Sequence, residues 1–109
     1  MPFDETLAER VRDQLKRRKK IVEKKMFGGV GFLLNGNMLV GVWKHWLIVR
    51  LGNDQADAAL RDPNVKMFDI TGRPMKGWIM VEPAGCEEDA ALKAWIADAI
   101  NFVSKLPAK

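Results

Sequence analysis

The chain of 109 residues has the size of one domain, and its 48% apolar and 29% charged residues are typical of a globular protein rather than a disordered one. No apolar run approaches the roughly 18 residues that span a bilayer, and residues 1–20 lack the apolar core of a signal peptide. The single cysteine, Cys86, can form neither an internal disulfide nor a thiolate zinc site. We therefore expect one soluble, cytoplasmic domain over residues 1–109, without a membrane partner, metal or cofactor.

The net charge of +4 is unevenly distributed along the chain. Between Arg10 and Lys25 nine basic residues stand against two acidic ones, a local charge of +7, so the remaining residues sum to −3. Such a segment attracts polyanions, although a charge run is more often a solvated face. The candidate polyanion-binding residues are Arg12, Lys16, Arg17, Lys19, Lys20, Lys24 and Lys25.

An apolar residue recurs every four positions at the start of the chain, which predicts an amphipathic helix from residue 4 to about residue 19. The apolar stripe consists of Phe3, Leu7, Val11 and Leu15. Asp4 is the expected N-cap. We expect the helix to fray near Arg18, where a charged residue returns to the stripe.

From residue 21 to residue 51 the apolar period changes to two, which predicts an antiparallel meander with strands at 21–27, 30–34, 38–43 and 46–51. Gly28 and Gly29 allow a bend between the first two strands. Asn35-Gly36-Asn37 predicts a tight hairpin turn, because Asn and Gly tolerate a positive φ. Lys44-His45 marks a further reversal.

The second half of the chain predicts a short helix that stops before Pro63, strands at 66–70 and 78–82, and a final helix. The final helix has apolar residues at spacings of three and four from Leu92 to Leu106, with acidic residues at 87–89 near its start. The predicted fold class is α+β: a mostly antiparallel sheet made of the meander and a second hairpin, with an N-terminal helix, a short middle helix and a C-terminal helix packed on the sheet.

The strand at 38–43 is apolar on both sides. Strict alternation places Met38, Val40 and Val42 on one face, and Leu39 and Trp43 on the other. Either a helix covers each face, or a second copy of the chain buries one of them.

No residue combination predicts catalysis, so we expect a protein that is not an enzyme. His45 lies in a predicted turn without an evident nucleophile, and Cys86 beside an acidic helix start is expected to be an inert thiol. The glycines at 28, 29 and 31 do not fit a dinucleotide-binding fingerprint and are expected to relieve crowding where strands bend.

Four residues form a candidate interaction surface. Trp43 and Trp46 flank a tight turn, where a pair of indoles can anchor an interface. Arg73 and Lys76 place two cations on the loop at 72–77, which suits a carboxylate or a phosphate, although an ordinary structural turn is the more common role.

Several short motifs occur in a fixed order: KKMFGG at 24–29, NGNM at 35–38, VR at 49–50 and FDITGRPMKGW at 68–78. Together they resemble the TfoX N-terminal domain family, which is TfoX/Sxy-like, over nearly the whole chain. The resemblance implies an α+β fold with a sheet flanked by helices, similar to secretion-chaperone-like folds, and it supplies no established catalytic residues. Lys44-His45-Trp46 is bulkier than the family's short polar turn.

Full-length TfoX and Sxy proteins regulate natural competence, and in them a C-terminal domain follows this one. Here the sequence stops at Lys109, so we expect a stand-alone domain, to which a role in competence cannot simply be transferred. The leading hypothesis is a non-enzymatic regulatory or protein-interaction domain, a homodimer that binds an unidentified protein. The alternative is a nucleic-acid-binding accessory domain that uses residues 10–25, although that segment lacks an aromatic stacking platform.

Overall fold

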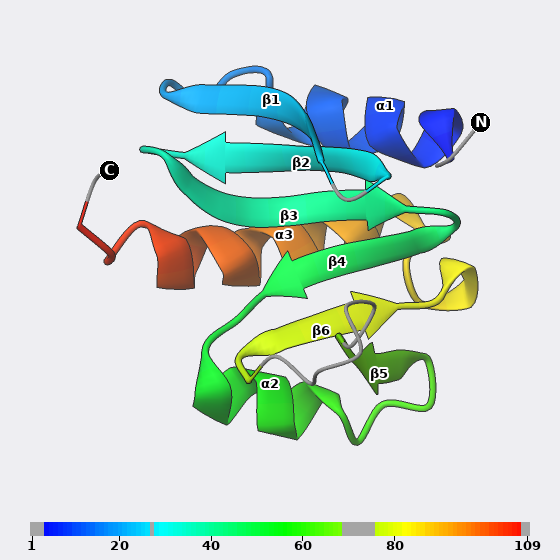
Figure 1. The fold of residues 1–109 in the computed structure, drawn as a ribbon. Coiled ribbons are helices and arrows are strands. Elements are labelled where there is room, and N and C mark those ends of the chain that lie inside the picture. Colours follow the sequence, from blue (N-terminus) through cyan, green and yellow to red (C-terminus); the bar gives the residue numbers. More distant parts are fainter. Residues whose placement is uncertain (1–3, 27, 69–75, 108–109) are drawn as a thin grey trace.

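The computed structural model describes residues 4–26, 28–68 and 76–107, and it confirms the predicted α+β arrangement (Figure 1). In this part of the chain one antiparallel sheet has the strand order β1-β2-β3-β4-β6-β5. The strands are β1 (Ile21–Met26), β2 (Gly29–Leu34), β3 (Asn37–Trp43), β4 (Trp46–Arg50), β5 (Val65–Met67) and β6 (Trp78–Val81). The helices are α1 (Glu5–Leu15), α2 (Asn53–Ala59) and α3 (Asp89–Val103), and a 3-10 turn, η1, spans Pro83–Gly85.

Helix α1 begins as predicted and ends earlier. Asp4 is the N-cap, since its Oδ1 accepts a hydrogen bond from the backbone N–H of Leu7 at 3.0 Å. The helix stops at Leu15 rather than near residue 19, because five consecutive cations follow, repel one another and offer no apolar side chain to bury. Lys20 then takes a φ of +67° and turns the chain into β1. Phe3, the first residue of the predicted stripe, lies outside the described residues.

The hairpin turns follow their predicted chemistry. Asn35 and Gly36 join β2 to β3 with φ angles of +54° and +82°, as a primed turn requires. Gly29 has a different role: a Cβ there would lie 2.1 Å from the carbonyl oxygen of Val42, so only glycine allows β2 and β3 to approach this closely. The prediction that glycine relieves crowding here is confirmed.

A β-bulge in β3 corrects the predicted facing of this strand. The register with β2 shifts between Phe32 and Leu33, so that Leu39 becomes an extra residue in β3. Leu39 therefore joins the two valines of the strand in the main core, whereas Met38 points to the opposite side. Strict alternation was wrong here because a bulge interrupts the period of two.

The helices cover one face of the sheet. Figure 1 shows α1 and α3 on the same side of the strands, with α2 beside the β5–β6 end. The main core lies between α1, α3 and the sheet. It includes Leu7, Val11 and Leu15 from α1, Leu92, Ile96 and Val103 from α3, and Phe32, Val40, Leu47, Val49, Ile79 and Val81 from the strands. In the described part of the chain no helix packs on the opposite face, so the alternative with a helix on each face is wrong.

The C-terminal elements differ from the predictions only at their ends. Strand β5 stops at Met67, and the predicted positions 69 and 70 lie outside the described residues. Helix α3 ends at Val103, although Leu106 still packs against the core. Within the described ranges no helix is long and apolar enough to cross a membrane.

Candidate functional site

Three of the four tryptophans lie on the sheet face that is not covered by a helix in residues 4–26, 28–68 and 76–107. A small buried cluster of Ile48, Phe68 and Met80 lies there, apart from the main core. Partly exposed side chains pack against it, namely Met38, Trp43, Trp46 and Trp78. We call this surface, formed by those seven residues, the tryptophan face.

Each indole of the tryptophan face has a cation over its ring. The pairs are Lys44 with Trp43, Lys66 with Trp46 and Arg50 with Trp78, at 4.7, 5.7 and 5.2 Å from the ring centroids. Lys24 of β1 points to the same side, because it stands in one cross-strand row with Gly31, Gly41 and Ile48. The tryptophan face is therefore apolar at its centre and bordered by cations, one of which, Lys66, also forms an ion pair with Glu82 at 3.9 Å.

The structure brings the predicted interaction residues only partly together. Trp43 and Trp46 are direct cross-strand partners on β3 and β4, as their spacing suggested. Lys76 lies instead at the far end of the sheet, in a hollow with Arg50 and Trp78. Arg73 lies outside the described residues.

Sequence reasoning did not assign Trp78 to the site. It alternates with Ile79 and Val81, which lie in the main core, so alternation alone places Trp78 and Met80 on the other face. The alternation alone could not assign Trp78 to the site. Its position beside Arg50 follows from the pairing of β6 with β4.

All seven candidate polyanion-binding side chains of residues 10–25 are exposed. Arg12 donates two hydrogen bonds to the carboxylate of Glu23, at 2.7 and 2.8 Å, and this contact lowers the pKa of Glu23. Within the described ranges the other six form no ion pair. Arg12 thus ties α1 to β1, and the remaining cations stay available to a polyanion.

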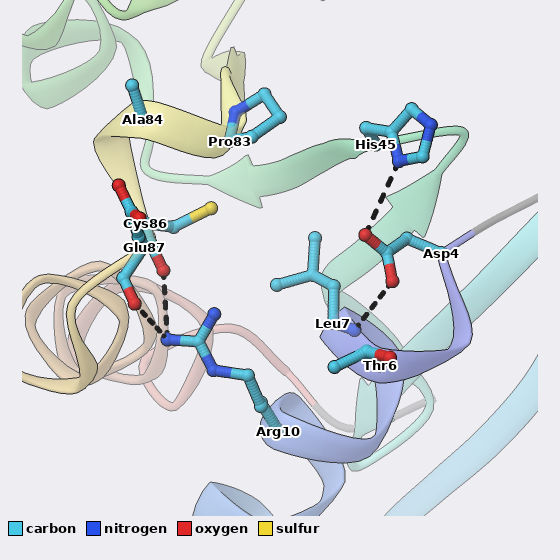
Figure 2. Close-up of a pocket in the computed structure, with 9 residues that line it drawn as sticks. All are labelled: Asp4, Thr6, Leu7, Arg10, His45, Pro83, Ala84, Cys86 and Glu87. Atoms are coloured by element: carbon cyan, nitrogen blue, oxygen red, sulfur yellow. Dashed lines mark hydrogen bonds and ion pairs between the residues drawn. The ribbon is translucent and has the colours of Figure 1, made fainter.

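A second hollow, of about 320 Å³, lies between the start of α1, the β3–β4 turn and η1 (Figure 2). Its lining combines a histidine, a cysteine, an arginine and carboxylates, which are residue types that catalytic sites also use. The lining residues are Asp4, Thr6, Leu7, Arg10, His45, Pro83, Ala84, Cys86 and Glu87.

Cys86 and His45 do not form a nucleophile–base pair in this hollow. The Cys86 thiol is buried, contacts the carbonyl oxygen of Glu82 at 3.6 Å, and has a pKa raised chiefly by burial. His45 lies on another wall in Figure 2, where its Nδ1 is 3.4 Å from Oδ2 of Asp4 and its side chain is 76% exposed. Burial raises the pKa of the Cys86 thiol and so disfavours the nucleophilic thiolate, and the inertness of Cys86 stays a prediction.

The arginine in this hollow joins two helices. One terminal nitrogen of Arg10 donates to the carbonyl oxygens of Cys86 and Glu87, at 3.0 and 2.9 Å, and to Oδ1 of Asp89 at 3.1 Å. The contact fastens α1 to the start of α3. We call residues 10–25 the basic segment. Arg10 is the residue of this segment with the clearest structural role.

Asp4, which also lines this hollow, contacts the turn between β3 and β4 that lies between Trp43 and Trp46. The backbone N–H of Asp4 donates to the carbonyl oxygen of Lys44 at 2.7 Å, and its side chain contacts His45. The pKa of Asp4 is lowered, mainly by the hydrogen bond from the Leu7 N–H. Asp4 thus connects the start of α1 to the β3–β4 turn beside Trp43 and Trp46.

No group of three or more His, Cys, Asp or Glu residues that could hold a metal ion occurs in the described ranges. In the comparison with known families, the model of the TfoX N-terminal domain matches residues 13–103. The chain belongs to the TfoX N-terminal domain family. The matched range includes all of the tryptophan face and most of the basic segment. The search of curated proteins and the search of solved structures found no match.

Proposed function

We propose that this member of the TfoX N-terminal domain family is a non-catalytic interaction domain that binds a protein through the tryptophan face. The supporting observation is a sheet face that no helix of the described residues covers, on which three partly exposed indoles have cations beside them. Tryptophan and arginine are the side chains most enriched at the energetic centres of protein interfaces. The charge favours a partner segment that combines apolar and acidic side chains.

The proposed role is regulatory, in line with the competence regulators that carry this domain. Such a domain would act by binding a partner protein and would not catalyse a reaction.

The charge of the tryptophan face bears on the expected homodimer. A face-to-face dimer would bring Lys44, Arg50 and Lys66 of two copies together, and like charges at an interface oppose association. We keep the homodimer as a prediction and expect a dimer mass at a concentration of about 50 µM in size-exclusion chromatography with light scattering. A monomer mass at that concentration would rule the prediction out.

The protein-binding proposal is tested by capture from a native cell extract after nuclease treatment. Lys44→Glu combined with Lys66→Glu reverses two charges beside Trp43 and Trp46 without removing an indole, and should abolish retention of the partner. Lys93→Glu is the matched control, because Lys93 is exposed on α3, an element of the opposite face. Equal retention by all three proteins would contradict the proposal.

A second candidate function is nucleic-acid binding by the basic segment, favoured by the six candidate polyanion-binding residues that are exposed and form no ion pair in the described ranges. If about six cations contact phosphates of duplex DNA, the logarithm of the affinity should fall with the logarithm of the salt concentration with a slope near five. The readout is fluorescence anisotropy at several salt concentrations. A salt-independent affinity, or no binding at low salt, would exclude this candidate.

A further inference from the structure

A hollow of about 310 Å³ lies at the end of the tryptophan face, where β4 leads into α2 and β6 begins. Its lining has two cations, Arg50 and Lys76, two aromatic rings, Trp78 and Phe102, and the amide of Asn53. We call it the Arg50–Lys76 pocket. No carboxylate is among its described lining residues.

Both cations of the pocket lack a polar side-chain partner in the described ranges. Neither Arg50 nor Lys76 forms an ion pair or side-chain hydrogen bond within the described ranges. The Arg50 guanidinium lies 5.2 Å from the ring centroid of Trp78 and 5.9 Å from that of Phe102. The two rings restrict the guanidinium while its N–H donors remain unpaired, so little side-chain entropy is lost when they bind an anion.

The backbone around the pocket is fixed by glycines. The N–H groups of Leu51 and Gly52 both donate to the carbonyl oxygen of Gly77, at 2.8 and 3.1 Å, which holds the start of β6 against the end of β4. Gly52 and Gly77 have φ angles of +86° and +87°, and a Cβ on Gly52 would lie 2.6 Å from the Phe102 ring. Two segments distant in sequence are thereby locked together with Lys76 and Arg50 lining one opening.

We infer that the Arg50–Lys76 pocket binds the phosphate group of a nucleotide. Two cations without a nearby described carboxylate match a phosphate, which has more charge than a single carboxylate and accepts the forked donors of arginine. The partly exposed indole of Trp78 supplies a surface on which a flat base stacks. The volume lies at the lower end of the range for small-ligand pockets, so it suits one nucleotide.

The same chemistry is offered by a free nucleotide and by one nucleotide of a single strand that continues along the tryptophan face. A rigid duplex keeps its bases stacked inside and cannot present one to Trp78. The pocket shares Arg50 and Trp78 with the tryptophan face, but the inference does not depend on the protein partner proposed above, because it concerns a different ligand and is tested by other substitutions.

The experiment is an NMR titration of the complete chain, which follows the indole N–H signals and the backbone amides of residues 50–53 and 76–78. The probes are adenosine 5′-monophosphate, adenosine, inorganic phosphate and a short single-stranded oligoadenylate. We expect saturable shifts with adenosine monophosphate at a Kd of about 1 mM or tighter, and affinities at least about tenfold weaker for adenosine and for inorganic phosphate.

Two substitutions assign the phosphate contact. Arg50→Gln and Lys76→Gln should each weaken adenosine monophosphate about tenfold, because each removes one charge-assisted hydrogen bond. Lys76 is exposed, so its variant tests the inference even if Arg50→Gln disturbs folding. Lys105→Gln is the matched control, because Lys105 lines the adjacent hollow and not this one.

The outcomes are distinct. A tighter affinity for the oligoadenylate identifies a single strand as the source of the nucleotide, and an equal affinity identifies the free nucleotide. Three results overturn the inference: no saturable shift with adenosine monophosphate or oligoadenylate up to about 10 mM, inorganic phosphate binding as tightly as the nucleotide, or the same loss in Lys105→Gln as in Lys76→Gln.

Discussion

The two faces of the sheet are built on different principles. On the helix-covered face, Val40, Leu47 and Val49 are 0% exposed and contact side chains from α1 and α3. On the tryptophan face, Ile48 is equally buried, but the indoles over it remain partly exposed with cations beside them. Burial in the main core explains these three side chains of the first face, whereas the second face keeps aromatic surface partly exposed.

The strongest test of this contrast is Phe32→Ala on the helix-covered face. Phe32 is 1% exposed, so the substitution removes buried apolar area and leaves a cavity, and should cost about 3–5 kcal/mol of unfolding free energy. Urea denaturation measures the change, with Phe32→Leu as a milder control. A cost below about 1 kcal/mol would mean that this face is not close-packed.

The corresponding change on the other face is Trp46→Ala. Because Trp46 is partly exposed and its removal opens no closed cavity, the stability cost should be only about 1–2 kcal/mol. Partner capture from extract should nevertheless be lost, and Trp46→Phe should restore part of it. A stability loss as large as that of Phe32→Ala would show that the two faces do not differ in packing.

Asp4 tests the support behind the tryptophan face. Asp4→Ala removes the N-cap of α1 and the contact with His45, and should cost about 1 kcal/mol at neutral pH. Since the pKa of Asp4 is lowered by folding, its charge stabilises the native state at a pH above the unfolded pKa near 3.9, and this contribution disappears as the pH falls through the lower native value.

The pH dependence separates the charge of Asp4 from its capping oxygen. Asp4→Asn keeps a capping oxygen and loses the charge, so wild type and variant should converge in stability as the pH falls below the native pKa of Asp4. Thermal unfolding followed by circular dichroism at several pH values gives the comparison. A constant difference between the two proteins across this range would show that the charge makes no contribution.

The smallest expected effect concerns the pair Arg12–Glu23, which joins the basic segment to β1. Both side chains are at least one-third exposed, so a double-mutant cycle with alanine should give a coupling of about 0.2–1 kcal/mol that decreases with added salt. Lys16→Ala, at an exposed cation without a described ion pair, is the reference change. A larger, salt-independent coupling would show that the Arg12–Glu23 pair stabilises the fold substantially.

Local patterns were sufficient to predict the elements and several of their ends. The Asp4 cap, the Asn35-Gly36 turn and the Trp43–Trp46 hairpin all depend on interactions between residues close in sequence, and each occurs as predicted. The exact stop of α1 was missed, because the repulsion among consecutive cations competes with helix propensity and the apolar period does not report it.

Contacts between distant segments decided the rest. The position of Trp78 beside Arg50 depends on β6 entering the sheet next to β4, and the bulge at Leu39, although it lies in a hairpin, depends on a register with β2 that the apolar period does not report. The sequence by itself determined the α+β class, the order of elements and the family. Only the tertiary structure decided that both large helices cover one face, and that the other face gathers three indoles and their cations, because strand order and register follow from the packing of the whole chain.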